Sequence, residues 1–383
     1  MATTTARDSV AEQAPLIRPF RVEVPQADLD DLRDRLDRAR WPDELAGDED
    51  DGIKQTYVRS LYDYWRDRYD WRTTEAQINA HPQFTTDIDG QNVHFLHVRS
   101  PEPDALPLII THGWPGSILE FFDIIGPLTN PVAHGGDAAD AFDVVIPSMP
   151  GYGLSGPTHE RGWTNYRIAG AWVELMRRLG YDRYGAVGND AGSMISPEVG
   201  RLDPEHVLGV HVTQIFSFPS GDPSEFADLT PEEMTELGTL QWFFENKMSF
   251  NKAFSEQPQT VAYGITDSPL GLLAWNAQLL GEDLDEEFQI ANVMLYWLTK
   301  TAASAGRLYY ENAHAHYRPT EPTTVPLGLA GFGGDFSGIR KFAERDHSNI
   351  VSWNMYPSGG HFAAHKAPDE LVGDIRAFYR SLR

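Results

Sequence analysis

One nine-residue run constrains this chain more than any other: residues 185–193 read Gly-Ala-Val-Gly-Asn-Asp-Ala-Gly-Ser. Its centre, Gly188-Asn189-Asp190-Ala191-Gly192, has the G-x-nucleophile-x-G form of a sharp turn from a strand into a helix. Such an elbow holds its central residue in a strained backbone conformation, so the residues two positions away must be very small. The pattern therefore predicts that Asp190 is presented at the top of a sheet.

The central residue of this elbow is an acid rather than Ser or Cys, which changes the chemistry that it can support. A carboxylate that attacks a substrate forms an ester intermediate with it. That step suits the opening of a strained or activated C–O or C–halogen bond and does not suit peptide cleavage. An ordinary turn after a strand could have the same sequence, so the interpretation needs further parts of a site.

The first of these parts lies upstream. Residues 106–110 form a short apolar run that is predicted to be a buried strand. The strand leads into His112-Gly113-Trp114-Pro115-Gly116-Ser117, and residues 118–125 then have the apolar spacing of a helix. In hydrolases of this design the loop after that strand supplies one backbone N–H to an oxyanion hole, and the residue after the nucleophile, here Ala191, supplies the second.

The second part lies downstream. Residues 350–356 are strand-like and are followed by Gly359-Gly360-His361, so the imidazole of His361 is free to turn towards the elbow and act as a base. A carboxylate should orient that imidazole. Asp335, which follows a predicted strand at 325–331, is the first choice, and Glu344 and Asp346 compete with it. The order nucleophile, acid, histidine is that of the α/β-hydrolase design.

Composition limits the alternatives. The chain has 383 residues, of which 41% are hydrophobic, and it has no cysteine, which excludes disulfides, thiolate nucleophiles and Cys-ligated zinc. A net charge of −25 disfavours a nucleic-acid partner, because phosphate binding needs a basic surface. No apolar run is long enough for a membrane span or a signal peptide, so we expect a cytoplasmic protein.

The order of predicted elements gives the fold class: an α/β protein with a mostly parallel central sheet. Strands are predicted near 107–111, 142–147, 184–188, 207–214, 325–331 and 350–356, with helices near 117–127, 164–179, 191–201 and 368–382. Residues 217–317 interrupt this alternation as an insertion that could cover the elbow as a lid. Within it, 231–244 and 286–310 are predicted helices and the stretch between them is predicted to be irregular.

The predicted domain division follows from this order. It comprises a disordered leader at 1–16, an N-terminal meander domain at 17–105, a core at 106–216 and 318–383, and a helical lid at 217–317. In the meander domain, 19–24 is predicted to be extended, 26–40 and 54–69 to be helices, and 84–89 and 93–98 to form a hairpin that turns at Asp89-Gly90.

With these parts in place, the chain resembles the epoxide hydrolases of the microsomal type, and in particular their soluble bacterial members. The resemblance runs from about residue 17 to the end. It rests on Arg40-Trp41-Pro42, His112-Gly113-Trp114-Pro115-Gly116-Ser117, Pro150-Gly151-Tyr152-Gly153, the elbow around Asp190, Asp267-Ser268-Pro269 with Gly271-Leu272, Arg307-Leu308-Tyr309-Tyr310-Glu311-Asn312 and Gly359-Gly360-His361-Phe362-Ala363-Ala364.

The resemblance implies a role for each matching residue. Asp190 would be the nucleophile, His361 the base that activates water, and Asp335 the partner of His361. The backbone N–H groups of Trp114 and Ala191 would form the oxyanion hole, and Tyr309 would protonate the epoxide oxygen. The product would be a vicinal diol. No metal or organic cofactor is implied, and the habit of the family implies a homodimer.

Three departures from the family pattern bear on the substrate. The second lid tyrosine is replaced by Phe250, so Tyr309 acts alone or another tyrosine, Tyr263 or Tyr152, replaces the missing donor. Ala191 stands where relatives often have Trp, which predicts a larger pocket and a bulkier or aromatic substrate. Asp335 stands where relatives often have Glu. The predicted pocket lining is Tyr152, Trp242, Phe243, Phe250 and Tyr263, with Trp114 beside them.

Two other functions compete with this interpretation. A dehalogenase would use the same scaffold and nucleophile, but such enzymes often bind halide with a Trp beside the nucleophile, where this chain has Ala191. A non-catalytic binding protein is suggested only by the loss of a hydroxyl at Phe250, while Asp190, Asp335 and His361 are all present.

Overall fold

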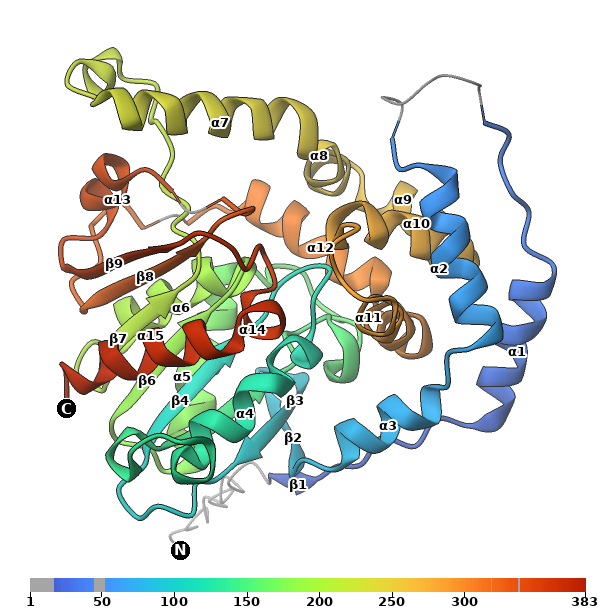
Figure 1. The fold of residues 1–383 in the computed structure, drawn as a ribbon, viewed down its shortest axis with the longest axis horizontal. Coiled ribbons are helices and arrows are strands. Elements are labelled where there is room, and N and C mark those ends of the chain that lie inside the picture. Colours follow the sequence, from blue (N-terminus) through green and yellow to red (C-terminus); the bar gives the residue numbers. More distant parts are fainter. Residues whose placement is uncertain (1–16, 45–51, 318, 337) are drawn as a thin grey trace, which may run out of the picture.

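The computed structural model describes residues 17–44, 52–317, 319–336 and 338–383 (Figure 1). The predicted leader at 1–16 lies outside these residues. At the centre of the fold is one sheet with the strand order β1-β2-β3-β5-β4-β6-β7-β8-β9. The strands are β1 Arg18–Pro19, β2 Gln83–Ile88, β3 Gln91–Val98, β4 Leu106–Thr111, β5 Phe142–Pro147, β6 Tyr184–Gly188, β7 Val207–Val212, β8 Leu327–Phe332 and β9 Ile350–Tyr356.

The sheet is mostly parallel, as the sequence predicts. From β5 through β4, β6, β7 and β8 to β9 every neighbouring pair is parallel, whereas β1, β2 and β3 join one edge through antiparallel pairs. The central parallel strands, such as β4 and β6, are buried apolar runs because helices cover both of their faces, whereas the edge strand β9 has no buried residue. Their carboxyl ends meet at one edge of the sheet, where loop residues from different strands can come together.

Helices lie on both faces of the sheet, which confirms the predicted fold class (Figure 1). α15 (Pro368–Arg380) packs on β7, β8 and β9 beside α4 (Phe122–Thr129), and α5 (Asn165–Leu179) and α6 (Ala191–Leu202) pack together on the opposite face. The ends of α5 follow from its sequence: Thr164 caps its first turn, and Gly180 ends it with a φ of 79°.

The N-terminal region contributes both to the sheet and to a layer of helices. Its hairpin, β2 and β3, turns where predicted, with positive φ at Asp89 (54°) and Gly90 (75°). The segment predicted to be extended at 19–24 forms neither helix nor turn; its first residue, Pro19, pairs with β2, and the N–H of Phe20 donates to the backbone oxygen of Gln83 (2.9 Å). The helices are α1 (Gln26–Asp37), α2 (Gln55–Asp67) and α3 (Trp71–Asn79), of which α3 was not predicted.

The insertion between β7 and β8 is helical throughout its middle, which corrects the prediction of an irregular stretch. Its helices, the lid helices, are α7 (Pro231–Lys247), α8 (Ser249–Glu256), α9 (Pro258–Asp267), α10 (Pro269–Leu280), α11 (Glu286–Thr299) and α12 (Ala302–Ala313). Pro258 and Pro269 are the first residues of α9 and α10, a position that lacks an intrahelical N–H bond in any case. The single helix predicted at 286–310 is broken at Lys300, which has a φ of 57°.

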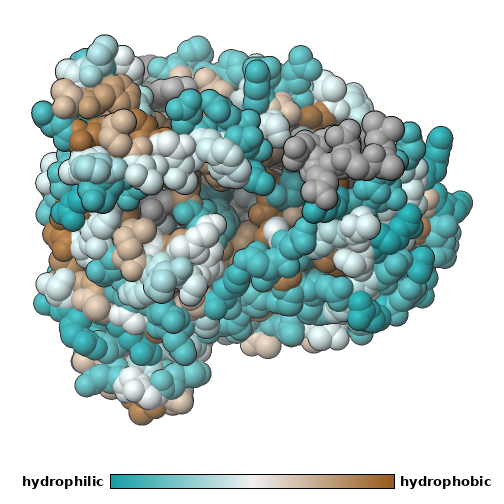
Figure 2. All heavy atoms as spheres, turned by 45° about the horizontal axis from the view of Figure 1, so that its top comes forward, coloured by the Kyte–Doolittle hydropathy of each residue, from teal (hydrophilic) through white to brown (hydrophobic). Residues whose placement is uncertain are grey.

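The lid helices contact the N-terminal helices, since α10 packs on α1 and α2, and α11 packs on α2 and α3. α7 is held less tightly: of its residues only Leu240 is buried, against Ile339 and Phe342. Exposed apolar side chains in and just before α7 include Met234, Trp242, Phe244 and Phe226. In Figure 2 apolar atoms gather on the left of the molecule, the side on which α7 begins in Figure 1.

No helix among the described ranges is long and apolar enough to span a bilayer. Several short helices lie in the connections between these elements. They are the 3-10 helices η1 (Ile118–Phe121) and η4 (Gly153–Ser155) and the α-helices α13 (Arg340–Asp346) and α14 (Ala363–Lys366).

The close contact between α6 and β4 gives a test of the fold. A Cβ at Gly192 would lie 1.9 Å from the backbone oxygen of Thr111, so Gly192→Ala should lower the free energy of unfolding by at least about 2 kcal/mol. Gly373→Ala is the control, because a Cβ there meets no atom within 4 Å in the exposed middle of α15 and should stabilise by up to about 1 kcal/mol. Urea unfolding measures both, and equal effects would contradict the packing described.

Candidate active site

Asp190 stands at the turn between β6 and α6 with a φ of 53° and a ψ of −120°, a strained conformation for a residue with a side chain. The two flanking glycines are needed for close contacts. A Cβ at Gly188 would lie 2.0 Å from the oxygen of Gly192, and one at Gly192 would collide with Thr111. The elbow predicted from the sequence is therefore present, and its carboxylate is partly exposed (22%).

The predicted oxyanion-hole groups both point at the Asp190 carboxylate. The N–H of Trp114 donates to Asp190 Oδ1 (3.0 Å), and the backbone N–H of Ala191, the next residue along the chain, acts with it to lower the pKa of that carboxyl. Gly113 allows this approach, because a Cβ there would lie 2.0 Å from Asp190 Oδ1. One carboxylate oxygen is thus held where a negative charge on oxygen would be stabilised by backbone donors.

Lid helix α11 holds the loop that carries Trp114. The Tyr296 hydroxyl donates to the backbone oxygen of Gly116 (2.6 Å), and the Ser117 hydroxyl donates to Asn292 Oδ1 (2.6 Å). Both hydroxyl groups are buried. The loop that carries Trp114 is therefore held from two sides, by β4, which precedes it, and by α11.

His361 faces Asp190 from the loop after β9. Its Nε2 lies 3.7 Å from Asp190 Oδ2, and its Nδ1 is hydrogen-bonded to Asp335 Oδ2 (3.1 Å). The competing acids lie elsewhere, since Glu344 pairs with Arg340 and Asp346 pairs with Arg345. Of the three carboxylates that the sequence left open, the structure brings only Asp335 to the imidazole.

Gln214 is a buried member of this site that the sequence analysis missed. Its Oε1 accepts from the N–H of Asp190 (2.8 Å) and from the Ser193 hydroxyl (2.9 Å), and its Nε2 donates to Asp335 Oδ2. One amide therefore ties the nucleophile's backbone to the acid that orients His361. The sequence signal that could have identified Gln214 is its position just after β7, at the carboxyl edge of the parallel sheet.

The charges around His361 determine the protonation of the site. Burial by itself would lower the pKa of the imidazole, but the carboxylates of Asp335 and Asp190 outweigh it and raise the pKa to about 10. Burial opposes ionisation of Asp335 as well, yet His361 and Gln214 hold its pKa below the usual value. Burial raises the pKa of Asp190, against the effects of His361 and the two backbone donors.

Tyr309 reaches the site from α12, and its aromatic neighbours orient it. The Tyr309 ring is stacked on that of Phe254 (5.6 Å between centroids), and the Phe250 ring contacts the Tyr309 ring edge to face (5.7 Å). Phe254 in turn contacts Trp114 edge to face (5.8 Å). Burial, with the nearby Asp190 charge, raises the pKa of Tyr309 well above its usual value, so the phenol keeps its proton. Phe250 thus lies beside the Tyr309 ring without supplying a second hydroxyl there.

Two of the predicted pocket residues are wrong. Tyr263 on α9 is 74% exposed and Trp242 on α7 is 54% exposed, so neither side chain is enclosed with Asp190. Helical spacing alone could not tell which face of a lid helix points to solvent. Tyr152, in contrast, is buried, with its ring against those of Trp114 and Tyr296. Phe243 is half-buried beside Phe244.

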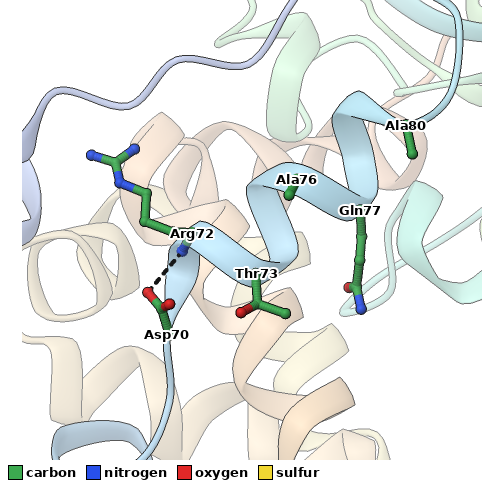
Figure 3. A pocket seen from close by; sticks show the side chains of 6 residues that line it. All are labelled: Asp70, Arg72, Thr73, Ala76, Gln77 and Ala80. Atoms are coloured by element: carbon green, nitrogen blue, oxygen red, sulfur yellow. Dashed lines mark hydrogen bonds between the residues drawn. The ribbon is translucent and has the colours of Figure 1, made fainter.

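Figure 3 shows a surface hollow along α3 that is separate from this site. It is lined by Asp70, Arg72, Thr73, Ala76, Gln77 and Ala80. Its polar groups already serve the helix, because Asp70 accepts from the N–H of Arg72 and the Arg72 guanidinium pairs with Glu75. Within the part of the chain that the structure describes, no group of three or more His, Cys, Asp or Glu side chains could hold a metal ion.

The fold and the site define a class: an α/β-hydrolase whose elbow presents a carboxylate. Comparison with known proteins agrees. Residues 17–121 match the family described as "Epoxide hydrolase N terminus", and residues 107–260 match "alpha/beta hydrolase fold". A Stigmatella aurantiaca protein provisionally named an epoxide hydrolase is 40% identical, over 96% of this chain and 86% of its own length. The chain belongs to the epoxide hydrolase family.

Two further relatives support this membership. Epoxide hydrolase 1 of Oryctolagus cuniculus is 31% identical, over 94% of this chain and 88% of its own length. The structure of Aspergillus niger epoxide hydrolase superposes with a TM-score of 0.85 at 27% identity and covers 97% of both chains. The protein is therefore an enzyme of the hydrolase class with the fold of these relatives.

The charge coupling within the site gives a test. Replacing Asp190 by Asn removes an anion that favours the protonated imidazole, so the pKa of His361 should fall below about 10. Titration of the ¹⁵N-labelled imidazole by NMR measures the shift. Asp369→Asn removes an exposed carboxylate on α15 and is the control. An unchanged pKa in the Asp190 variant would show that the two side chains are not coupled.

Proposed function

We propose that Asp190 opens an epoxide by attack of its Oδ2 on one oxirane carbon, which forms an alkyl ester. The observation that carries this proposal is the unequal setting of the two carboxylate oxygens. Oδ1 accepts the N–H of Trp114, while Oδ2 faces His361 Nε2 at 3.7 Å. Oδ1 would become the carbonyl oxygen of the ester, and Oδ2 would form the new bond to the substrate carbon. The carbonyl oxygen would then already lie at the backbone donors of the oxyanion hole.

Tyr309 is proposed as the group that protonates the leaving oxygen. As the C–O bond of the oxirane breaks, its electron pair stays on oxygen, which takes the phenolic proton. Burial raises the pKa of Tyr309, so the phenol is present in its protonated form to donate. Phe250 contributes only its ring, so Tyr309 is the one lid donor in this proposal. Tyr152 contributes an aromatic wall.

His361 is proposed to act in the second half of the reaction. Once Asp190 is esterified, its negative charge is gone, and the pKa of His361 should fall because one of the anions that raise it has been removed. The imidazolium then gives up its proton, which returns to the Tyr309 phenolate left by ring opening. The neutral imidazole takes a proton from water as the water oxygen attacks the ester carbonyl. The tetrahedral oxyanion rests on the N–H groups of Trp114 and Ala191. As it collapses, the proton on His361 passes to the leaving oxygen, which releases a vicinal diol and leaves Asp190 as a carboxylic acid that ionises again.

The pocket favours a bulky or aromatic substrate. Ala191 adds little volume beside the nucleophile, and the rings of Trp114, Tyr152 and Phe250 provide apolar walls. This substrate class, a homodimeric state and a cytoplasmic location remain proposals taken from the sequence.

The ester intermediate can be trapped. His361→Gln should still be alkylated but should hydrolyse the ester slowly, so the protein should gain the mass of one epoxide on Asp190. Intact-mass and peptide mass spectrometry after incubation with a panel of styrene-like, aliphatic and polycyclic epoxides measures this. The double variant His361→Gln, Asp190→Asn is the control and should gain no mass. A single turnover of the wild type in H₂¹⁸O that labels the diol directly and leaves Asp190 unlabelled would refute the proposal.

Removal of the Tyr309 hydroxyl should slow ring opening. We expect Tyr309→Phe to reduce the rate of alkylation by a factor of about 10² or more, the usual contribution of a positioned acid. Stopped-flow measurement of a single turnover follows that step. Tyr310→Phe is the matched control, because the ring of Tyr310 stacks instead on His314 (4.0 Å between centroids) and should leave the rate unchanged. Equal rates in the two variants would assign the proton to another donor.

A further inference from the structure

The steps above give no role to the buried amide of Gln214. This side chain is 1% exposed and follows β7. Its Oε1 accepts from the backbone N–H of Asp190 (2.8 Å) and from the Ser193 hydroxyl (2.9 Å). Its Nε2 donates to Asn189 Oδ1 (2.9 Å) and to Asp335 Oδ2. Each polar atom of the amide therefore has partners, as a buried amide requires.

The partners determine which end of this amide is oxygen. A backbone N–H can only donate, so the atom that faces the N–H of Asp190 must be Oε1. A carboxylate can only accept, so the atom that faces Asp335 must be Nε2. Turning the amide over would break both bonds. Its anchored oxygen end therefore keeps the N–H donor directed at Asp335.

His361 and Gln214 bind the same oxygen of Asp335. His361 Nδ1 lies 3.1 Å from Asp335 Oδ2, the atom to which Gln214 Nε2 donates. A second donor stabilises the carboxylate and so weakens the attraction that it exerts on a protonated imidazole. The charges agree with this arrangement. Burial opposes ionisation of Asp335, yet His361, Gln214 and the backbone N–H of Phe336 hold its pKa below the usual value.

His361 must lose its proton before it can act as a base on water. Burial by itself would lower the pKa of the imidazole, but Asp335, with further effects from Asp190 and Glu120, raises it to about 10. An ester on Asp190 removes one of these anions, and the contact with Asp335 remains. The bond from Gln214 therefore acts on the carboxylate that has the largest effect on His361.

We propose that Gln214 is a positioning residue for hydrolysis of the ester on Asp190. Its Nε2–H shares Asp335 Oδ2 with His361 and limits the attraction of that carboxylate for the imidazole proton. The neutral base is thereby available at a lower pH than Asp335 would otherwise allow. The inference rests on the proposed function. Gln214 itself gives up no proton and forms no bond to the substrate.

Gln214→Met tests this role, because Met has a similar length and no hydrogen-bond donor. Without the second donor, Asp335 attracts the proton on His361 more strongly, so ester hydrolysis should need a higher pH. We expect the acidic limb of the hydrolysis rate to move up by about 0.5 to 1 pH unit. A merely structural role predicts the opposite direction. If Asp335 only loosened from His361, the pKa of the imidazole would fall and the limb would move to lower pH.

Thr213→Val is the matched control. The Thr213 hydroxyl donates to Asn189 Oδ1 (2.6 Å) and lies 2.9 Å from Gln214 Oε1, so it belongs to the same buried network. Val keeps the shape of Thr and leaves the bond from Gln214 to Asp335 in place. The acidic limb of Thr213→Val should therefore coincide with that of the wild type.

Other ionisable groups near His361 and Asp190 are the same in all three proteins. Burial raises the pKa of one carboxyl to about 8 and raises the pKa values of three phenols well above their usual value. These groups are Glu120 on η1, Tyr152 after β5, Tyr296 on α11 and Tyr309 on α12. A shift between the wild type and Gln214→Met therefore reports on the bond from Gln214 to Asp335.

The measurement uses the full-length enzyme in single-turnover quench-flow with styrene oxide. Decay of the adduct on Asp190, followed across about pH 5 to 10, gives the hydrolysis rate. Effects on alkylation are excluded, because the decay is measured after the adduct has formed. An acidic limb of Gln214→Met that stays at the wild-type position or moves to lower pH would overturn the proposal. An equal upward shift in Thr213→Val would overturn it as well.

NMR covers the case in which Gln214→Met does not fold. Asp190→Asn has a neutral side chain in place of the uncharged ester. In this variant, labelled with ¹⁵N-glutamine, the side-chain amide signal of Gln214 should titrate with the same midpoint as His361, since both bind Asp335 Oδ2. An amide signal that does not follow the imidazole would count against the shared oxygen.

Failure of the proposed function looks different from failure of this inference. In that case the wild type itself would form no adduct on Asp190 with any epoxide, and H₂¹⁸O would label the diol directly. If only the role of Gln214 is wrong, the adduct forms and decays in the wild type, and the acidic limb of Gln214→Met shows no upward shift.

Discussion

The close approach of α6 to the end of β4 is the contact on which the site depends. Gly192 lies against the backbone oxygen of Thr111, and Thr111 is the last residue before the loop that carries Trp114. Because no side chain separates the two segments, the N–H of Trp114 can reach the carboxylate of Asp190. A helix and a strand packed at the usual distance would hold these groups too far apart for a hydrogen bond. The backbone strain at Asp190 is the cost of this geometry, and burial of the apolar β4, β6 and α6 offsets it.

Three carboxyl groups surround one imidazole, and their environments give them different protonation states. His361 and Gln214 hold the pKa of Asp335 low, so it stays an anion and keeps the imidazole oriented. Burial raises the pKa of Asp190, which the backbone donors and His361 partly oppose. Burial raises the pKa of the carboxyl of Glu120, on η1, to about 8, although Asn189 donates a hydrogen bond to it. Like charges at short distance cannot all be ionised at little cost, and this division of roles is a physical solution to that problem.

The sequence predicted those features that depend on local geometry. The elbow needs glycine two residues to either side of Asp190, and the central parallel strands, such as β4 and β6, are apolar runs, so both leave a pattern in neighbouring residues. Gln214 and Glu120 leave no such pattern, because their roles arise from contacts with segments far away in the chain. The same limit explains the errors in the lid. The stretch between the helices predicted at 231–244 and 286–310 was predicted to be irregular, although Pro258 and Pro269 in it begin helices, and the direction of Trp242 and Tyr263 depends on which neighbours α7 and α9 have.

The lid is more than a cover, because its helices differ in what they hold. α11 is buried along most of its length and bonds directly to the oxyanion-hole loop through Tyr296 and Asn292. α12 brings Tyr309 to the site, whereas α7 buries only Leu240. Rigid donors are needed where charge develops, since their reorganisation would otherwise add to the barrier. Looser packing is tolerable in a helix that touches neither the oxyanion hole nor the proton donor. These helices therefore differ in how firmly they are held: α11 and α12 pack against the loop of Trp114 and carry Tyr309, whereas α7 is mostly exposed and buries only Leu240.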